Sequence, residues 1–191
     1  MRRTWRPPTG STAGCWCCAT GVTRVELGLQ STSDEVLTTV RRGHTVADAK
    51  HALALLRAAG FKTDLHMMPQ LPGATPAGDV AMMAELWRDP DYRPDMIKIY
   101  PCAVLADTEL MKWFETGRYT PYPDAELFET LVAIKSQVPR YARISRLIRD
   151  IPSGSIVAGN KCTSLRQNLQ RELTRRGLAC ACLRCREVSH V

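Results

Sequence analysis

The alternation of short apolar strands with helices constrains the fold of this chain more than any other feature of its sequence. β-Branched and apolar stretches predict buried strands at 22–29, 61–68 and 96–100. Apolar residues at helical spacing, bounded by Ser, Thr and Gly, predict helices over 34–43, 45–60 and 79–88. Strands that alternate with helices at this spacing form a parallel sheet. The chain is therefore predicted to be an α/β protein.

The later sequence extends this pattern without closing it. Further elements are predicted as helices near 108–116 and 124–137, a strand over 142–145 and a basic helix over 165–176. A complete (β/α) barrel takes about eight strands. Since only three or four strands are predicted within 191 residues, the sheet is either part of a barrel or a small open sheet.

The positive charge is concentrated in the last quarter of the chain. Residues 1–138 carry 15 Lys and Arg against 16 Asp and Glu, whereas residues 139–191 carry 11 against 3. Guanidinium groups suit phosphate oxygens, and Tyr141 can stack on a base. The predicted RNA-binding residues are Arg140, Arg143, Arg146, Arg149, Arg166, Arg175 and Arg176. The alternative is a solvated arginine-rich surface that has no partner.

A cluster of cysteines near the C-terminus predicts a metal site. Three thiols lie in the motif Cys180-x-Cys182-x-x-Cys185. Thiolates at this spacing can converge on one cation, and a structural zinc site takes four ligands. We favour Cys102 as the fourth ligand, because it follows a predicted strand and would tie the tail to the sheet. Other possibilities are Cys162 or His190 as the fourth ligand, or thiols that hold no metal.

A second group of cysteines lies near the N-terminus, at Cys15, Cys17 and Cys18. Adjacent cysteines rarely bind one metal together, and the spacing does not fit a three-cysteine iron–sulfur loop. We interpret these residues as unliganded thiols in an irregular leader.

Polar side chains in or next to the apolar strands predict a pocket. They are Glu26, Gln30, His66, Lys98 and Tyr100. In a parallel sheet that is buried on both faces, such residues usually point into a site. Any one of them can instead be a satisfied buried polar group, so the prediction depends on the set. The sequence has no P-loop, GxGxxG motif or Ser/His/Asp set that would indicate a particular chemistry.

The apolar runs are too short for a membrane span. A run such as 52–56 falls far below the roughly 20 apolar residues that a spanning helix needs. The basic N-terminus lacks the apolar region of a secretory signal. We therefore expect no membrane partner and a reducing, cytoplasmic location, in which clustered cysteines more often bind metal than form disulfides.

Six motifs follow one another along the chain: GVTRVELGLQS (21–31), RGHT (42–45), HMMPQLPG (66–73), PDMIKIYP (94–101), RDIP (149–152) and RCREV (184–188). Together they resemble the catalytic subunit of the Elongator complex and its bacterial and archaeal single-chain relatives. The resemblance runs from about Gly21 to His190, which is nearly the whole chain.

The resemblance implies an enzyme that modifies tRNA by radical chemistry. Members of the family combine a radical S-adenosylmethionine barrel, which holds a [4Fe–4S] cluster, with an acetyltransferase-like domain that handles acetyl-CoA. Together these parts install a carboxymethyl group on C5 of the wobble uridine. The resemblance also implies that tRNA binds the basic tail, and it places the five polar strand residues inside the barrel.

The chain departs from the family at both ends. The cluster cysteines of the family lie upstream of the segment that matches Gly21, and the acetyltransferase half would follow the cysteine cluster. We therefore expect a leader over 1–20 that does not resemble the family, part of a radical SAM barrel over 21–150, and a basic helix with a cysteine-rich metal-binding linker over 151–191. Gln70 also stands where the family commonly has glycine.

Two hypotheses follow for function. In the first, the chain is an internal fragment of the tRNA-modifying enzyme and is inactive alone, and its partners are tRNA and the missing halves of the enzyme or an accessory complex. In the second, it is a zinc-bound RNA-binding module without chemistry.

Overall fold

The computed structural model describes residues 21–149, 151–162 and 164–187. Its centre is a four-stranded parallel sheet with the strand order β1-β2-β3-β5. The strands are β1 (Arg24–Gln30), β2 (Lys62–Met67), β3 (Met96–Ile99) and β5 (Arg143–Arg146). The predicted parallel α/β sheet is confirmed.

The helices begin mostly at polar caps that the sequence provides. They are α2 (Asp34–Thr39), α3 (Val46–Ala58), α4 (Pro76–Arg88), α5 (Glu109–Glu115), α6 (Asp124–Ser136) and α7 (Leu165–Arg175). Thr45 and Asp48 form a capping box at the start of α3. Helix α4 begins three residues before the predicted position 79, because Thr75 caps it and Pro76 suits a first turn.

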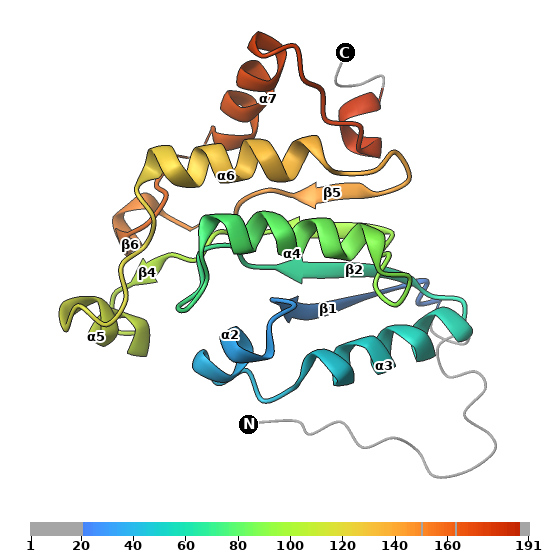
Figure 1. The fold of residues 1–191 in the computed structure, drawn as a ribbon, viewed down its shortest axis with the longest axis horizontal. Helices are drawn as coiled ribbons and strands as arrows, with labels where there is room; N and C mark the ends of the chain where they lie inside the picture. The colour runs from blue at the N-terminus through green and yellow to red at the C-terminus, as the bar shows by residue number, and fades with distance from the viewer. Residues whose placement is uncertain (1–20, 150, 163, 188–191) are drawn as a thin grey trace.

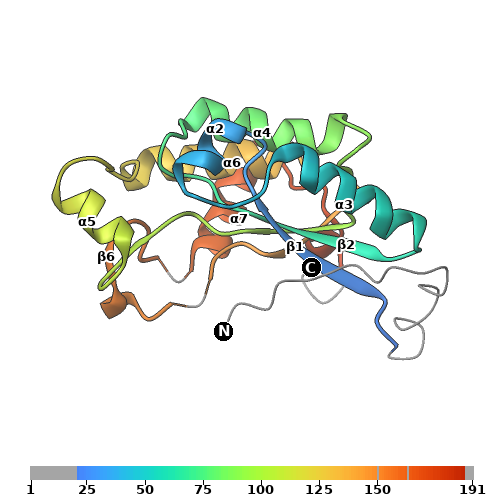
Figure 2. The same cartoon turned by 90° about the horizontal axis from the view of Figure 1, so that it is seen from below.

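Alternating side chains give the sheet an apolar face and a polar face. Leu65 and Met67 of β2 are fully buried, as are Ile97 and Ile99 of β3. They share one core with residues of the helices, including Leu53, Met83, Leu86, Leu131 and Leu169. Figure 2 shows α3, α4 and α6 together on one side of the sheet. The intervening strand residues therefore point to the opposite side.

A small second sheet lies beyond the carboxyl ends of the main strands. The strands β4 (Val104–Leu105) and β6 (Ile156–Ala158) pair antiparallel, and the short 3₁₀ helix η1 (Ser153–Ser155) precedes β6. In Figure 1 the arrowheads of β1, β2 and β5 point toward the side of the molecule that holds β4, β6 and α5. This sheet was not predicted, because two- and three-residue strands leave no measurable periodicity.

The C-terminal segment returns to the opposite end of the main sheet. After α7 the chain forms the short 3₁₀ helix η2 (Leu183–Arg186), and the backbone N–H of Leu183 donates to the carbonyl of Ala142, 2.9 Å away. Ala142 directly precedes β5, so η2 lies at the amino end of this strand. None of the described helices is long and apolar enough to cross a membrane.

Candidate functional site

The polar face of the sheet brings together four of the five residues predicted to line a pocket. Glu26 of β1 and Lys98 of β3 form an ion pair that spans β2. His66 lies beside Lys98 in the strand register, and Tyr100 follows β3. The bond from Lys98 lowers the pKa of the Glu26 carboxyl, so this carboxylate stays ionised at neutral pH.

His66 and Tyr100 form an aromatic pair on this face. Their ring centroids lie 4.3 Å apart in an edge-on arrangement. Burial, together with the nearby charge of Lys98, lowers the pKa of His66, so its imidazole is neutral at pH 7. The buried Nε2 atom of His66 has no hydrogen-bond partner among the residues that the structure describes. Because buried polar atoms are rarely left unpaired, this atom indicates a place for a ligand.

Asp64 is a further polar residue of this face that the sequence analysis missed. Its side chain is buried, and burial raises the pKa of the carboxyl. Ser145 of β5 donates from Oγ to Asp64 Oδ2 at 3.1 Å, whereas the buried Oδ1 has no hydrogen-bond partner within the described part of the chain. Asp64 stands two positions before His66, and this period-two spacing places both on one face. That spacing was the signal available in the sequence.

Gln30, the fifth predicted residue, ends β1 in a left-handed conformation with φ of 70°. Its carbonyl accepts from the backbone N–H of Met68 at 2.9 Å, and the side chain is half-buried. The register between β1 and β2 shifts just before it, between Leu27 and Gln30. Gln30 therefore lies at the carboxyl end of the sheet, where the loops converge.

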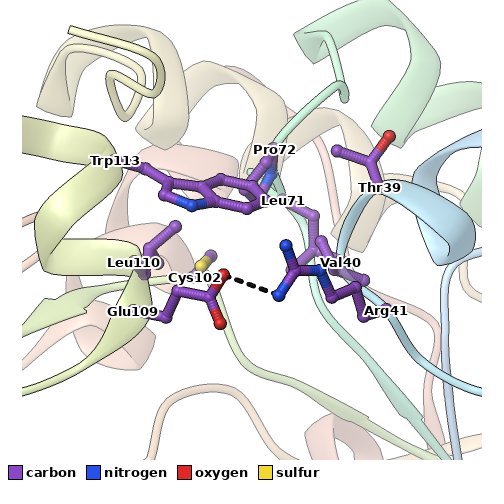
Figure 3. A pocket seen from close by; sticks show the side chains of 9 residues that line it. All are labelled: Thr39, Val40, Arg41, Leu71, Pro72, Cys102, Glu109, Leu110 and Trp113. Carbon is purple, nitrogen blue, oxygen red and sulfur yellow. Dashed lines mark ion pairs between the residues drawn. The ribbon is translucent and has the colours of Figure 1, made fainter. Parts of the chain in front are cut away.

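A cavity of about 210 Å³ lies at this carboxyl end of the sheet. Figure 3 shows Trp113 over Leu110, with Arg41 facing Glu109. The ion pair between Arg41 and Glu109 joins the segment after α2 to α5 at 2.8 Å. The complete lining is Thr39, Val40, Arg41, Leu71, Pro72, Cys102, Glu109, Leu110 and Trp113. The lining comes from the end of α2 and the residues after it, from the loops that follow β2 and β3, and from α5. The carboxyl ends of the strands are where (β/α) barrels bind their ligands.

The structure brings the three C-terminal cysteines close together. The sulfur atoms of Cys180, Cys182 and Cys185 all lie within 4.8 Å of one another. Sulfurs bound at about 2.3 Å to one tetrahedral zinc are about 3.8 Å apart, so the spacing suits a single cation. Thiol hydrogen bonds from Cys180 and Cys185 lower the pKa of Cys182, which makes it the favoured thiolate.

The structure does not bring Cys102 to these three cysteines. Cys102 lies in a separate apolar cluster with Val36 and Leu71, and burial raises its pKa to about 11. Cys162 accepts a hydrogen bond from Asn168 at the start of α7 and is not part of the three-sulfur group. The remaining cysteines, Cys15, Cys17 and Cys18, lie outside the described residues, as does His190.

Several of the predicted RNA-binding arginines are held by partners within the protein. Arg143 pairs with Glu187, Arg175 with Glu172, and Arg176 with both Glu129 and Glu172. Arg166 is half-buried and donates to the carbonyl of Ile144 at 3.1 Å. Those that are exposed beside β5 are Arg140, Arg146 and Arg149, together with Tyr141. At least four of the seven predicted arginines therefore already have partners within the protein.

Two family models match consecutive parts of the chain. The Radical SAM superfamily model matches residues 17–86. The Radical_SAM C-terminal domain model matches residues 94–175. The fold class predicted from the sequence, part of a radical-SAM-type barrel followed by a cysteine cluster, is confirmed.

Comparison with individual proteins extends the match to nine-tenths of the chain. The tRNA uridine(34) acetyltransferase of Methanocaldococcus jannaschii is 43% identical over 171 residues, which cover 90% of this chain and 32% of that protein. The enzyme of the same name from Dehalococcoides mccartyi is 45% identical, with 89% and 37% covered. Mouse Elongator complex protein 3 is 36% identical, with 88% and 31% covered.

A solved structure also matches nine-tenths of this chain. The archaeal Elp3 of Methanocaldococcus infernus with an N-terminal deletion superimposes with a TM-score of 0.87 at 42% identity. The match covers 92% of this chain and 41% of that one. The resemblance predicted from the six motifs is confirmed, and the chain spans about a third of the length of the curated relatives it matches.

Proposed function

We propose that this chain, a relative of the tRNA uridine(34) acetyltransferases and of Elongator complex protein 3, is the later part of the radical SAM barrel of a tRNA-modifying enzyme. The observation that carries the proposal is the polar sheet face, on which Asp64 and His66 each have a buried atom that no other described residue hydrogen-bonds. The enzyme would make 5-carboxymethyluridine at the wobble position of tRNA from acetyl-CoA and S-adenosylmethionine. Its partners would be tRNA and the rest of the enzyme or an accessory complex.

The polar face fits S-adenosylmethionine, whose ribose and amino-acid groups need buried donors and acceptors. S-adenosylmethionine would supply the radical for the reaction. Lys98, fixed by Glu26, offers an ammonium to a carboxylate, and Asp64 offers an acceptor to hydroxyl or ammonium groups. Neutral His66 can accept or donate one hydrogen bond through Nε2. These residues would bind and orient the ligand.

A [4Fe–4S] cluster does not fit the described residues. Their single group of three cysteines lies at the amino end of β5, away from the carboxyl ends at which barrel sites form. We therefore propose that the described chain binds S-adenosylmethionine without cleaving it.

A chimera tests the proposal. Residues 21–187 replace the matching segment of the Methanocaldococcus jannaschii relative, and modified tRNA nucleosides are measured by mass spectrometry. We expect the chimera to form 5-carboxymethyluridine, and His66→Ala to lower the rate at least about tenfold because the ligand loses its orientation. The matched control is His51→Ala, at an exposed position of α3. Unchanged activity in the folded His66→Ala chimera would contradict the assigned role.

The isolated chain provides a second test. We expect no 5′-deoxyadenosine from purified chain, S-adenosylmethionine and a reductant. Measurable 5′-deoxyadenosine would refute the proposed inactivity.

The alternative function is a zinc-bound RNA-binding module, which the cysteine group and the exposed arginines beside β5 favour. Cys180, Cys182 and Cys185 would hold the zinc in either case. RNA affinity should then fall with salt, with log K changing by about 0.7 to 0.9 per log unit of salt for each phosphate neutralised. A slope near zero would exclude this function.

A further inference from the structure

A buried lysine lies beside the cysteine group. Lys135 of α6 has no solvent exposure, and its neighbours along the helix, Leu131 and Ile134, are core residues. The Nζ atom lies 3.9 Å from Cys185 Sγ. No carboxylate forms an ion pair with Lys135 in the part of the chain that the structure describes. A buried ammonium needs a compensating negative charge, and sulfur is the partner found here.

Two arginines also lie around the cysteines. Arg166 and Arg184 donate to the backbone carbonyls of Ile144 and Ser145, at 3.1 Å each. The charge of Lys135 acts on Cys180, and that of Arg166 interacts with all three cysteines. Glu187 pairs with Arg143. The surroundings of the three sulfurs are therefore electropositive, which suits an anionic centre.

We propose that Lys135 is the positioning residue of the metal–thiolate centre, and this rests on the metal site proposed above. Its ammonium donates to the Cys185 thiolate and balances the charge of the centre. Three thiolates and one divalent zinc carry a net charge of −1, which a single buried ammonium neutralises. Partners that hydrogen-bond to metal ligands orient them, and their loss typically lowers metal affinity 10- to 100-fold.

Substitution of Lys135 tests the proposal through metal affinity. Lys135→Met keeps an unbranched chain and removes the charge, Lys135→Arg keeps the charge, and Lys112→Met on the exposed surface of α5 is the matched control. Zinc affinity is measured by competition with a chelating dye, and thiolate coordination by the charge-transfer absorption of the Co²⁺-substituted protein. We expect zinc binding about 10- to 100-fold weaker in Lys135→Met, partial rescue in Lys135→Arg and no change in Lys112→Met.

A second measurement separates this role from simple packing. Thermal unfolding is recorded with bound zinc and with EDTA for wild type and Lys135→Met. We expect zinc to raise the midpoint of Lys135→Met by less than it raises that of wild type, whereas a lysine that only fills space would shift both forms equally. Wild-type zinc affinity in folded Lys135→Met would overturn the proposal and leave the metal site intact. Wild-type protein that binds no zinc would overturn the metal site as well. Neither result would alter the outcome of the chimera assay.

Discussion

Asp79→Asn should stabilise the protein at alkaline pH and have little effect in acid. The Asp79 carboxyl lies in the first turn of α4 and is buried. Its Oδ2 atom accepts from the backbone N–H of Gln70 at 2.7 Å and from the Tyr122 hydroxyl at 3.1 Å. Asparagine can accept both bonds through its single carbonyl oxygen. The substitution therefore removes the charge and keeps the contacts.

The magnitude follows from the pKa of Asp79, which burial raises from 3.8 to about 6. Because the folded state binds this proton more tightly than the unfolded state, the group destabilises the fold above pH 6. This cost fades as the pH falls from about 6 to about 4, where both states are protonated. Two pKa units correspond to about 3 kcal/mol, which is the upper value expected for the gain from Asp79→Asn at pH 8.

Urea unfolding at pH 8 and at pH 5 measures this effect. We expect the free energy of unfolding of Asp79→Asn to exceed that of wild type at pH 8 by about 1 to 3 kcal/mol, and the difference to shrink at pH 5. Exposed Asp124→Asn, in the first turn of α6, is the control for the change of residue type. An Asp79→Asn protein that is less stable than wild type at pH 8 would refute the reasoning, because the ionised carboxylate would then stabilise the fold by more than its burial destabilises it.

Three further predictions follow. Gln70 has φ of 69° and a side-chain hydrogen bond to the Tyr122 carbonyl. Replacing it by Gly should lower the unfolding free energy by about 1 kcal/mol less than replacing it by Ala, since only Gly adopts this backbone without strain. Equal losses in the two variants would contradict this. Cys182→Ala should abolish binding of one equivalent of zinc, whereas Cys102→Ala should retain it, both checked by elemental analysis; loss of zinc from Cys102→Ala would show that Cys102 is a ligand. The imidazole of His66, followed by NMR, should titrate below its ordinary pKa of 6.5, because burial favours its neutral form. The fold should therefore lose stability from this group as the pH falls below 6.5. Titration above 6.5 would contradict the expected effect of burial.

The sequence predicts the main sheet well because its strands are long enough to show a pattern. The stretch 61–68 contains β2, and 96–100 contains β3. The start of α4 was placed too late because Thr75 and Pro76 stand in a segment rich in Pro and Gly. Such residues are typical both of loops and of the first turn of a helix. Composition alone does not separate these two roles.

The candidate site was predicted in part for a related reason. Glu26, His66 and Lys98 stand out because they interrupt apolar stretches, and the structure places them on one face. Asp64 interrupts the same stretch as His66, but it is not among the predicted pocket residues. Lys135 gives no signal at all, since lysine is a common helix former and its burial depends on how α6 packs against α7 and η2.

The direction of the parallel strands explains why Cys102 lies apart from the other three cysteines. Residues that follow a strand lie at the carboxyl edge of the sheet, and residues that precede a neighbouring parallel strand lie at the amino edge. Cys102 follows β3, whereas η2 bonds to Ala142, which precedes β5. A strand of four residues is about 13 Å long, and a zinc–sulfur bond is only about 2.3 Å. A ligand from the loop after β3 therefore cannot reach a centre that forms before β5. The same geometry keeps the cavity beside Trp113 at one end of the sheet and the metal centre at the other, so zinc loss should weaken the fold without changing the residues that line this cavity.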